Sequence, residues 1–226
     1  NNSIIQETFE YGTIYKKSKF WSDLEDFGEN ALLKMKIIKI RLYTGLYKES
    51  NAIIGISITF KNVITGEIKE TVSHKGSIDF IDMKEFVIAN DEYLTDFHIR
   101  FPFLDLDYVS QLGYSTKKRH FFVPENPEDG EDKHTWLNQG NNIIVGTFGH
   151  FNEKLDSIGC FYVSKEDYTV SRLYGFLILR YKIKKDANFK EEWDKKYKSL
   201  PIEYQYIWRF INLPNAVIPH IIKYLL

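Results

Sequence analysis

The sequence has little of several features that would place a chain in a specialised class. It contains one cysteine, Cys160, so no disulfide can form within the chain, which favours a reducing compartment without excluding a secreted domain. Lysine and arginine (30) balance aspartate and glutamate (31), so no chain-wide positive charge is available for nucleic acid or an anionic membrane. The apolar stretch at residues 213–226 is too short and too interrupted to span a bilayer. We therefore expect a soluble chain.

No signal peptide is visible, although the sequence begins at Asn1 rather than at a methionine. We expect a cytoplasmic location, or one within an intracellular assembly, and a secreted location stays open.

Motifs for catalysis and for cofactors are also absent. The six histidines show no paired spacing suited to zinc, and the acidic run at residues 125–132 lacks the alternating acids and placed glycine of a calcium loop. No glycine-rich phosphate loop occurs, and the Gly-Tyr-Ser at residues 113–115 lacks the second glycine of a nucleophile elbow. Cys160 lies in a predicted buried strand and is interpreted as a core residue. We expect no metal, no cofactor and no enzymatic activity.

Aromatic residues, in contrast, are abundant at 16%, and they favour the half-buried surfaces of β-sheets. Short apolar or alternating runs separated by turn residues predict strands over residues 37–42, 53–60, 67–72, 94–101, 109–116, 119–123, 143–148 and 157–164. The last pair brackets a loop, and the two runs within residues 109–123 are predicted to form a hairpin. Regularly spaced short strands indicate a sandwich, a barrel or a prism.

A weak internal repeat narrows these choices. Residues 55–60, 111–115 and 157–162 share an alternation of small or polar residues with apolar ones, and each contains a glycine. Such a repeat favours three similar sheets packed about one axis, with the glycines where backbones approach closely. An all-β chain also produces such echoes by chance, so this alternative stays open.

The pattern changes near the C-terminus. Residues 173–183 still alternate and are predicted as a strand. Phe189, Trp193 and Tyr197 follow at a spacing of four, which predicts one apolar stripe of a helix. Pro201 ends this helix and is suited to the first turn of another.

These patterns divide the chain into two units. Residues 1–167 form the β domain, and residues 168–226 form an extension in which a strand precedes helices. The segment 189–226 is too apolar for a free tail, so we expect it to dock on the β domain or on a protein partner.

The most specific part of the sequence is the run IVGTFG at residues 144–149, followed by a short loop and by DSIG at residues 156–159. This run resembles the last hairpin of jacalin-like lectins. Earlier segments follow the order of that family, namely YG at 11–12, FWSD at 20–23, and residues 37–40, 54–56 and 92–95. The resemblance covers about residues 9–165. It implies a β-prism of three four-stranded antiparallel sheets in a pseudo-threefold arrangement, here with a mainly helical C-terminal tail.

The resemblance also implies binding of a mono- or oligosaccharide of the mannose or galactose type, without a metal. Sugar hydroxyls both donate and accept, so a carboxylate beside backbone N–H groups satisfies several of them. In the family, an Asp that closes the last loop is the acceptor, and amides of that loop and a glycine of the first turn assist it. By position, Asp156 is this carboxylate, Glu153 and Lys154 supply backbone N–H groups or side-chain contacts, and Gly12 is the first-turn glycine.

This sequence departs from the family pattern at several positions. Asn152 replaces the loop glycine; Asn accepts positive φ more readily than other side chains, so we expect the turn to be kept, with its side chain near the sugar. Thr13 replaces a second glycine, and no aromatic residue stands at Glu153 or Lys154. Two functions stay open: a carbohydrate-binding module, or a non-enzymatic structural or adaptor subunit with a lapsed sugar site. The predicted sugar-site residues are Gly12, Asn152, Glu153, Lys154 and Asp156.

Overall fold

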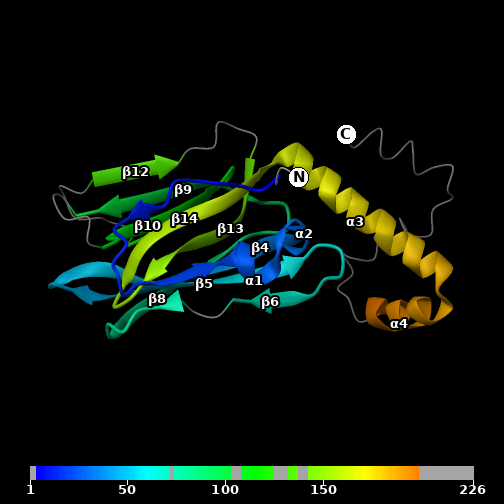
Figure 1. Cartoon of the computed structure of the whole chain (residues 1–226), viewed down its shortest axis with the longest axis horizontal. Helices are drawn as coiled ribbons and strands as arrows, with labels where there is room; N and C mark the ends of the chain where they lie inside the picture. Colours follow the sequence, from blue (N-terminus) through cyan, green and yellow to red (C-terminus); the bar gives the residue numbers. More distant parts are fainter. Residues whose placement is uncertain (1–3, 72–73, 103–107, 125–131, 137–141, 199–226) are drawn as a thin grey trace.

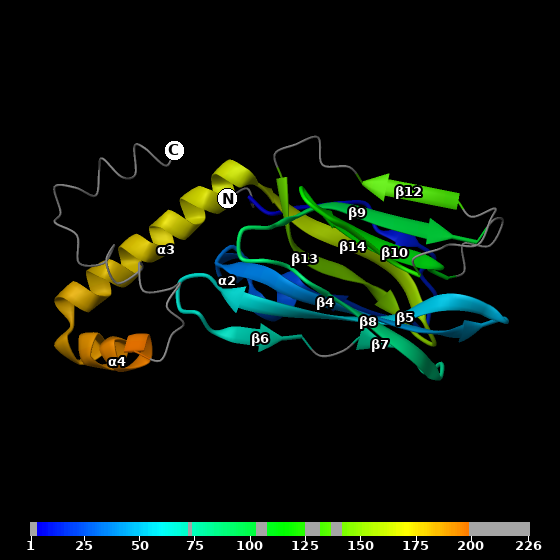
Figure 2. The same ribbon diagram turned by 180° about the vertical axis from the view of Figure 1, so that it is seen from behind.

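The computed structural model describes residues 4–71, 74–102, 108–124, 132–136 and 142–198. Strands dominate the chain as far as Ser164 and form three antiparallel sheets, and two helices follow the last strand. The helices project from one end of the β domain (Figure 1), and the view from behind shows the same arrangement (Figure 2). The predicted all-β fold with a helical extension is therefore confirmed.

Each sheet is built around a central antiparallel hairpin. The strands of these hairpins are β4 (Met35–Tyr47) and β5 (Ser50–Asn62), β9 (Leu94–Phe101) and β10 (Gln111–Thr116), and β13 (Asn142–Phe151) and β14 (Leu155–Ser164). The three segments that carry the repeat, residues 55–60, 111–115 and 157–162, lie on β5, β10 and β14. These are the second strands of the three hairpins. The internal repeat of the sequence therefore reflects three equivalent sheets.

Outer strands complete each sheet in the same way. These strands are β1 (Gln6–Glu7), β2 (Tyr11–Gly12), β3 (Lys19–Ser22), β6 (Ile68–Glu70), β7 (His74–Lys75), β8 (Phe80–Val87), β11 (His120–Val123) and β12 (Asp132–Trp136). The second hairpin strands pair with β1 and β2, with β6 and β7, and with β11, whereas the first pair with β3, β8 and β12. Because β1 and β2 follow one another along β14, and β6 and β7 along β5, each sheet has four strand positions, as predicted.

Local sequence explains several of these strands. The predicted strand at residues 94–101 coincides with β9, whose Phe97, Ile99 and Phe101 share one face of the strand and are buried in the core. The predicted hairpin within residues 109–123 is the β10–β11 pair. Between β4 and β5, Lys48 and Glu49 both have positive φ (50° and 68°), the backbone of a two-residue hairpin turn that matches the strand twist.

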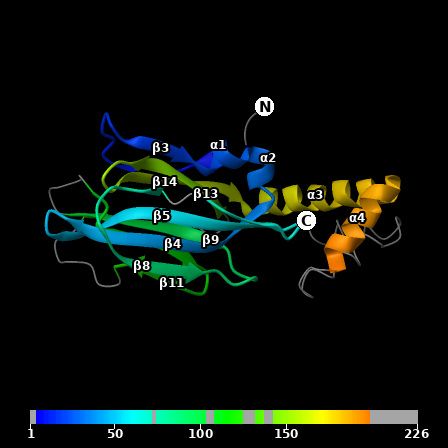
Figure 3. The same cartoon turned by 90° about the horizontal axis from the view of Figure 1, so that it is seen from below.

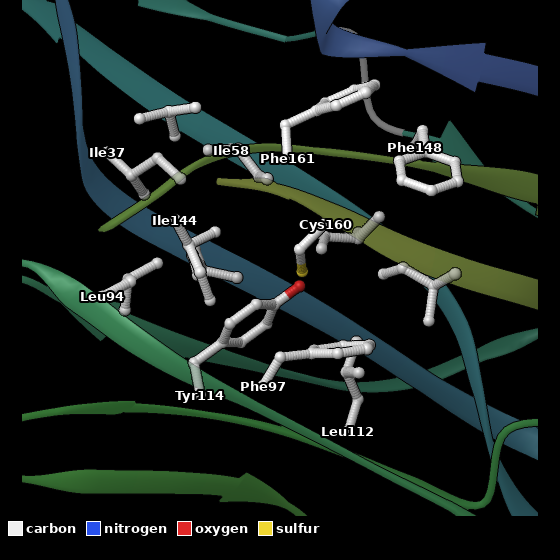
Figure 4. Packing of buried hydrophobic residues seen from close by; sticks show 14 of the residues in the cluster. Ile37, Ile58, Leu94, Phe97, Leu112, Tyr114, Ile144, Phe148, Cys160 and Phe161 are labelled. Carbon is white, nitrogen blue, oxygen red and sulfur yellow. The ribbon is translucent and has the colours of Figure 1, made fainter. Parts of the chain in front are cut away.

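The three sheets enclose one core. Seen from below, β4 and β5 lie between the β13–β14 pair on one side and β8 with β11 on the other (Figure 3). Phe86 of β8 stacks on Phe121 of β11, with ring centroids 4.7 Å apart, and so joins two sheets at their edges. In the centre, the hydroxyl of Tyr114 points to the sulfur of Cys160 (Figure 4). Burial raises the pKa of the Cys160 thiol well above its usual value, so its predicted role as a core residue is confirmed.

Two short helices, α1 (Asp23–Phe27) and α2 (Glu29–Leu32), connect β3 to β4. Ser22 caps α1 by accepting a hydrogen bond from the backbone N–H of Glu25 at 3.3 Å. The first residue of α1, Asp23, is buried, and its carboxylate accepts a hydrogen bond from the Thr147 backbone N–H at 2.7 Å. This contact attaches the connection to β13.

The predicted strand at residues 173–183 is wrong, because these residues belong to the helix α3 (Lys165–Lys185). The hydroxyl of Ser164 accepts from the Asp167 backbone N–H at 3.0 Å and starts the helix, and lysines in the last turn suit its negative end. The alternation misled because Gly175, Leu179 and Ile183 also follow a helical spacing, and all three are among the residues that α3 buries.

The predicted helix around residues 189–197 is confirmed as α4 (Ala187–Lys198). Its buried Trp193 forms a small second core with Leu179 and Ile183 of α3 and with Val63 and Ile64, which follow β5. The predicted helix from Pro201 and most of the predicted docking segment 189–226 lie outside the described residues, so a protein partner for this tail stays a prediction. Within the described part, neither α3 nor α4 has the length and apolar character needed to cross a membrane.

Candidate carbohydrate-binding site

The turn between β13 and β14 brings the predicted loop residues together at the end of the prism away from α3. Phe151 pairs with Leu155, and the backbone N–H of Asn152 donates to the carbonyl of Lys154 at 3.1 Å, so Asn152, Glu153 and Lys154 form a tight turn. Asn152 and Glu153 are exposed. Among the described non-glycine residues, positive φ occurs only in the β4–β5 turn, so the turn is kept without the positive φ that we expected of Asn152.

Gly12 lies directly against Asp156, as the resemblance implied. It pairs with Ser157 in the ladder between β2 and β14, and the backbone N–H of Thr13 donates to the carbonyl of Asp156 at 3.2 Å. Gly12 has a φ of 123°, and a Cβ there would lie 2.2 Å from the carbonyl oxygen of Asp156. No residue with a side chain fits this approach without moving the strand. The first turn and the last loop therefore meet at Asp156.

The carboxylate of Asp156 is fully engaged within the chain. The Lys154 ammonium donates to Oδ1 at 3.0 Å, and the Ser18 hydroxyl donates to Oδ2 at 2.6 Å. Asp156 is 1% exposed and Lys154 4%, so this is a buried ion pair. Each charge keeps the other from being buried alone, which would be strongly unfavourable.

Two aromatic rings complete the surroundings of the Lys154 ammonium. Its nitrogen lies 5.1 Å from the ring centroid of Tyr15 and 4.6 Å from that of Tyr47, both within the range of cation–π attraction. Tyr108, which is buried, packs edge-on against Tyr47 at 5.3 Å. The ammonium is thus held by one carboxylate and two electron-rich rings.

A fourth segment packs against the loop backbone. The N–H of Ile78 donates to the carbonyl of Glu153 at 3.1 Å. At Gly76, a Cβ would lie 1.9 Å from that carbonyl oxygen and 2.5 Å from the nitrogen of Lys154. The chain between β7 and β8 therefore covers the main chain that was predicted to offer amides to a sugar.

Sequence reasoning named Gly12, Asn152, Glu153, Lys154 and Asp156, and the structure gathers all five in one region. The sequence did not point to Ser18, Tyr15, Tyr47 or Gly76. These residues contact the site from segments that lie far from Asp156 in the sequence. No local pattern marks these residues.

A second polar cluster lies beside the site and has the residue types of a hydrolase. The Ser157 hydroxyl donates to Glu10, and one ring nitrogen of His150, Nδ1, lies 2.6 Å from Glu10 and 3.4 Å from Ser157. A catalytic triad needs the histidine between the other two groups, with a different nitrogen facing each. Here the serine contacts the acid directly and is fully buried, so this geometry does not activate it. Across the described residues, no three potential ligand side chains gather to hold a metal ion.

Comparisons with known proteins agree with this architecture. The family model of the jacalin-like lectin domain matches residues 24–161. The chain therefore belongs to the jacalin-like lectin domain family, and the predicted β-prism is confirmed. No curated protein matches the sequence.

Several solved lectins share the fold at low sequence identity. Calystegia sepium agglutinin is 20% identical, with a TM-score of 0.54, and the match covers 71% of this chain and 97% of the agglutinin. Single-chain recombinant jacalin is 19% identical, with a TM-score of 0.53 and coverage of 72% and 95%. Artocarpin in its complex with mannotriose is 23% identical, with a TM-score of 0.51 and coverage of 70% and 96%. In each case the match leaves over a quarter of this chain uncovered.

Proposed function

We propose that this protein is a non-catalytic carbohydrate-binding module that binds its sugar at the carboxylate of Asp156. The observation that carries the proposal is the convergence of Gly12, Thr13 and the β13–β14 turn on the backbone around Asp156, which places its carboxylate where the first turn meets the last loop. A carboxylate with rigid backbone beside it is suited to neighbouring hydroxyl groups, because it forms charge-assisted hydrogen bonds with them. The neighbours in the family support the ligand class, since artocarpin is seen with mannotriose and Calsepa lectin with a biantennary N-glycan.

The buried ion pair sets a condition on this activity. In the structure, the Lys154 ammonium and the Ser18 hydroxyl occupy the positions from which sugar hydroxyls would donate to Asp156. A ligand therefore has to displace Lys154, which weakens each single site. Binding through several linked copies would compensate for this weakness.

A second candidate function is a structural or adaptor subunit in which Asp156 only holds the loop together. It is favoured by the burial of Asp156, whose two oxygens are both satisfied, and by apolar side chains on the outer strand β8, where Phe80 and Ile81 are more than half exposed. Exposed apolar side chains grouped in this way suit contact with another protein.

A glycan array separates the two functions. Asp156→Asn alone would leave a buried lysine without its counter-charge, at a cost of about 3–5 kcal/mol, and the protein would then unfold easily. The double variant Lys154→Met/Asp156→Asn removes both charges and keeps the shape, so it is the better negative control. Binding by the wild type that the double variant loses supports a lectin with its acceptor at Asp156. Absence of binding by folded wild type and by folded Lys154→Met supports the adaptor.

A further inference from the structure

The group that Asp156 holds in this structure is an ammonium ion rather than a hydroxyl. Its surroundings are a buried carboxylate at 3.0 Å and two tyrosine rings with centroids at 5.1 and 4.6 Å. Carboxylate and aromatic faces together favour a cation over a neutral group, because both present negative charge to it. The side chain of Lys154 thus shows that the site accommodates an ammonium group.

Displacement of Lys154 by different ligands leaves different charges behind. A neutral sugar would take the place of the ammonium and leave the carboxylate of Asp156, which is 1% exposed, without a counter-charge. Breaking a buried pair from one side in this way is strongly unfavourable. A ligand with its own ammonium group would restore the pair, while the displaced Lys154 side chain would be solvated as an ordinary exposed lysine. The exchange is then balanced in charge.

We propose that the Asp156 site, formed by Asp156, Ser18, Tyr15 and Tyr47, selects sugars that carry a free amino group, and that Lys154 occupies it as an internal substitute for such a ligand. This proposal rests on the proposed function and specifies its ligand class. Hexosamines with an unacetylated amine are the simplest members of the class. Their ammonium would replace Nζ of Lys154 against Asp156, and their ring hydroxyls would face the exposed turn residues Asn152 and Glu153.

The first test does not require a sugar. Lys154→Ala removes a propylammonium group from between Asp156 and the rings, so the variant is expected to unfold at a lower temperature than the wild type. Added n-propylammonium should raise the unfolding temperature of this variant more than that of the wild type, and n-propanol should not. The control Lys154→Ala/Asp156→Asn lacks the carboxylate and should show no ammonium-specific rescue. Equal effects of the amine and the alcohol, or rescue of the control, would overturn the proposal.

The second test measures sugar preference by calorimetry or NMR titration. Lys154→Ala should bind glucosamine roughly tenfold more tightly than glucose or N-acetylglucosamine, as expected when a charge-assisted hydrogen bond replaces a neutral one. The preference should fall as the pH rises through the pKa of the ligand's amine. If neutral and amino sugars bind equally well to Lys154→Ala, and Lys154→Ala/Asp156→Asn binds neither, the carbohydrate function stands and the amine selection fails. If neither sugar binds to folded Lys154→Ala, the amine selection fails, and the carbohydrate function fails with it only if the wild type also binds no glycan on the array.

Discussion

The buried carboxyl of Asp23 should make the stability of this protein fall as the pH rises from acid to neutral. Burial, the largest influence, raises the pKa of Asp23 from 3.8 to about 7, against hydrogen bonds from Thr147 that lower it. Between these two values the folded protein keeps the proton that the unfolded chain has already released. The folded state then binds more protons than the unfolded state, so the free energy of unfolding decreases as the pH rises.

The magnitude follows from the two pKa values. The folded and unfolded values of about 7 and 3.8 differ by about three units, and each unit corresponds to about 1.4 kcal/mol, so Asp23 should lower the free energy of unfolding by about 4 kcal/mol between pH 4 and pH 8. Asp23→Asn has nearly the same shape, never ionises, and keeps an oxygen to accept from the Thr147 N–H. At pH 4 the variant should be slightly less stable than the wild type, because its buried amide hydrogens need partners. At pH 8 it should be more stable.

Urea unfolding at a series of pH values measures this difference. Trp21 is a suitable fluorescent reporter, because it is buried and its indole N–H donates to the Thr147 hydroxyl at 3.5 Å, beside Asp23. The stability of the wild type minus that of Asp23→Asn cancels other titrating groups. Asp26→Asn is a matched control: Asp26 also raises the pKa of Asp23, so its removal should shift the loss of stability to lower pH. A difference between wild type and Asp23→Asn that stays constant from pH 4 to pH 8 would refute the reasoning.

Two further predictions concern contacts that hold the site and the extension. Gly12→Ala should destabilise the protein more than Gly28→Ala. Both glycines have positive φ, so both substitutions carry a backbone strain of about 1–3 kcal/mol, but only at Gly12 would the new Cβ also lie 2.2 Å from the carbonyl of Asp156, whereas no atom lies within 4 Å at Gly28; equal unfolding temperatures for the two variants would contradict this. Tyr168→Phe should lower the free energy of unfolding by about 1–2 kcal/mol, because the buried hydroxyl donates to the Met35 carbonyl at 2.7 Å. Faster hydrogen exchange in α3 should accompany that loss, and an unchanged urea midpoint would show that the bond contributes nothing.

The sequence by itself determined the elements whose signal is local. Alternation over residues 94–101 defined β9, and the spacing of Phe189, Trp193 and Tyr197 defined α4. The run around residues 144–159 pointed to the family and to Asp156. These patterns are informative because the buried residues of a strand or a helix recur at a fixed period. That period can be recognised in the sequence without knowing what covers the buried face.

Tertiary structure decided what the local pattern left ambiguous. Residues 173–183 carry apolar side chains that fit either period, and the cap at Ser164 together with the packing of Leu179 and Ile183 selects the helix. Tertiary structure also decided which residues surround Asp156. Ser18, Tyr47 and Gly76 lie far from Asp156 in sequence and reach its surroundings only because two of the sheets bring their loops to one end of the prism. The carboxylate of Asp156 was predictable from the sequence. The ion pair that buries it with the Lys154 ammonium depends on contacts between distant segments, and no local sequence pattern predicts such contacts.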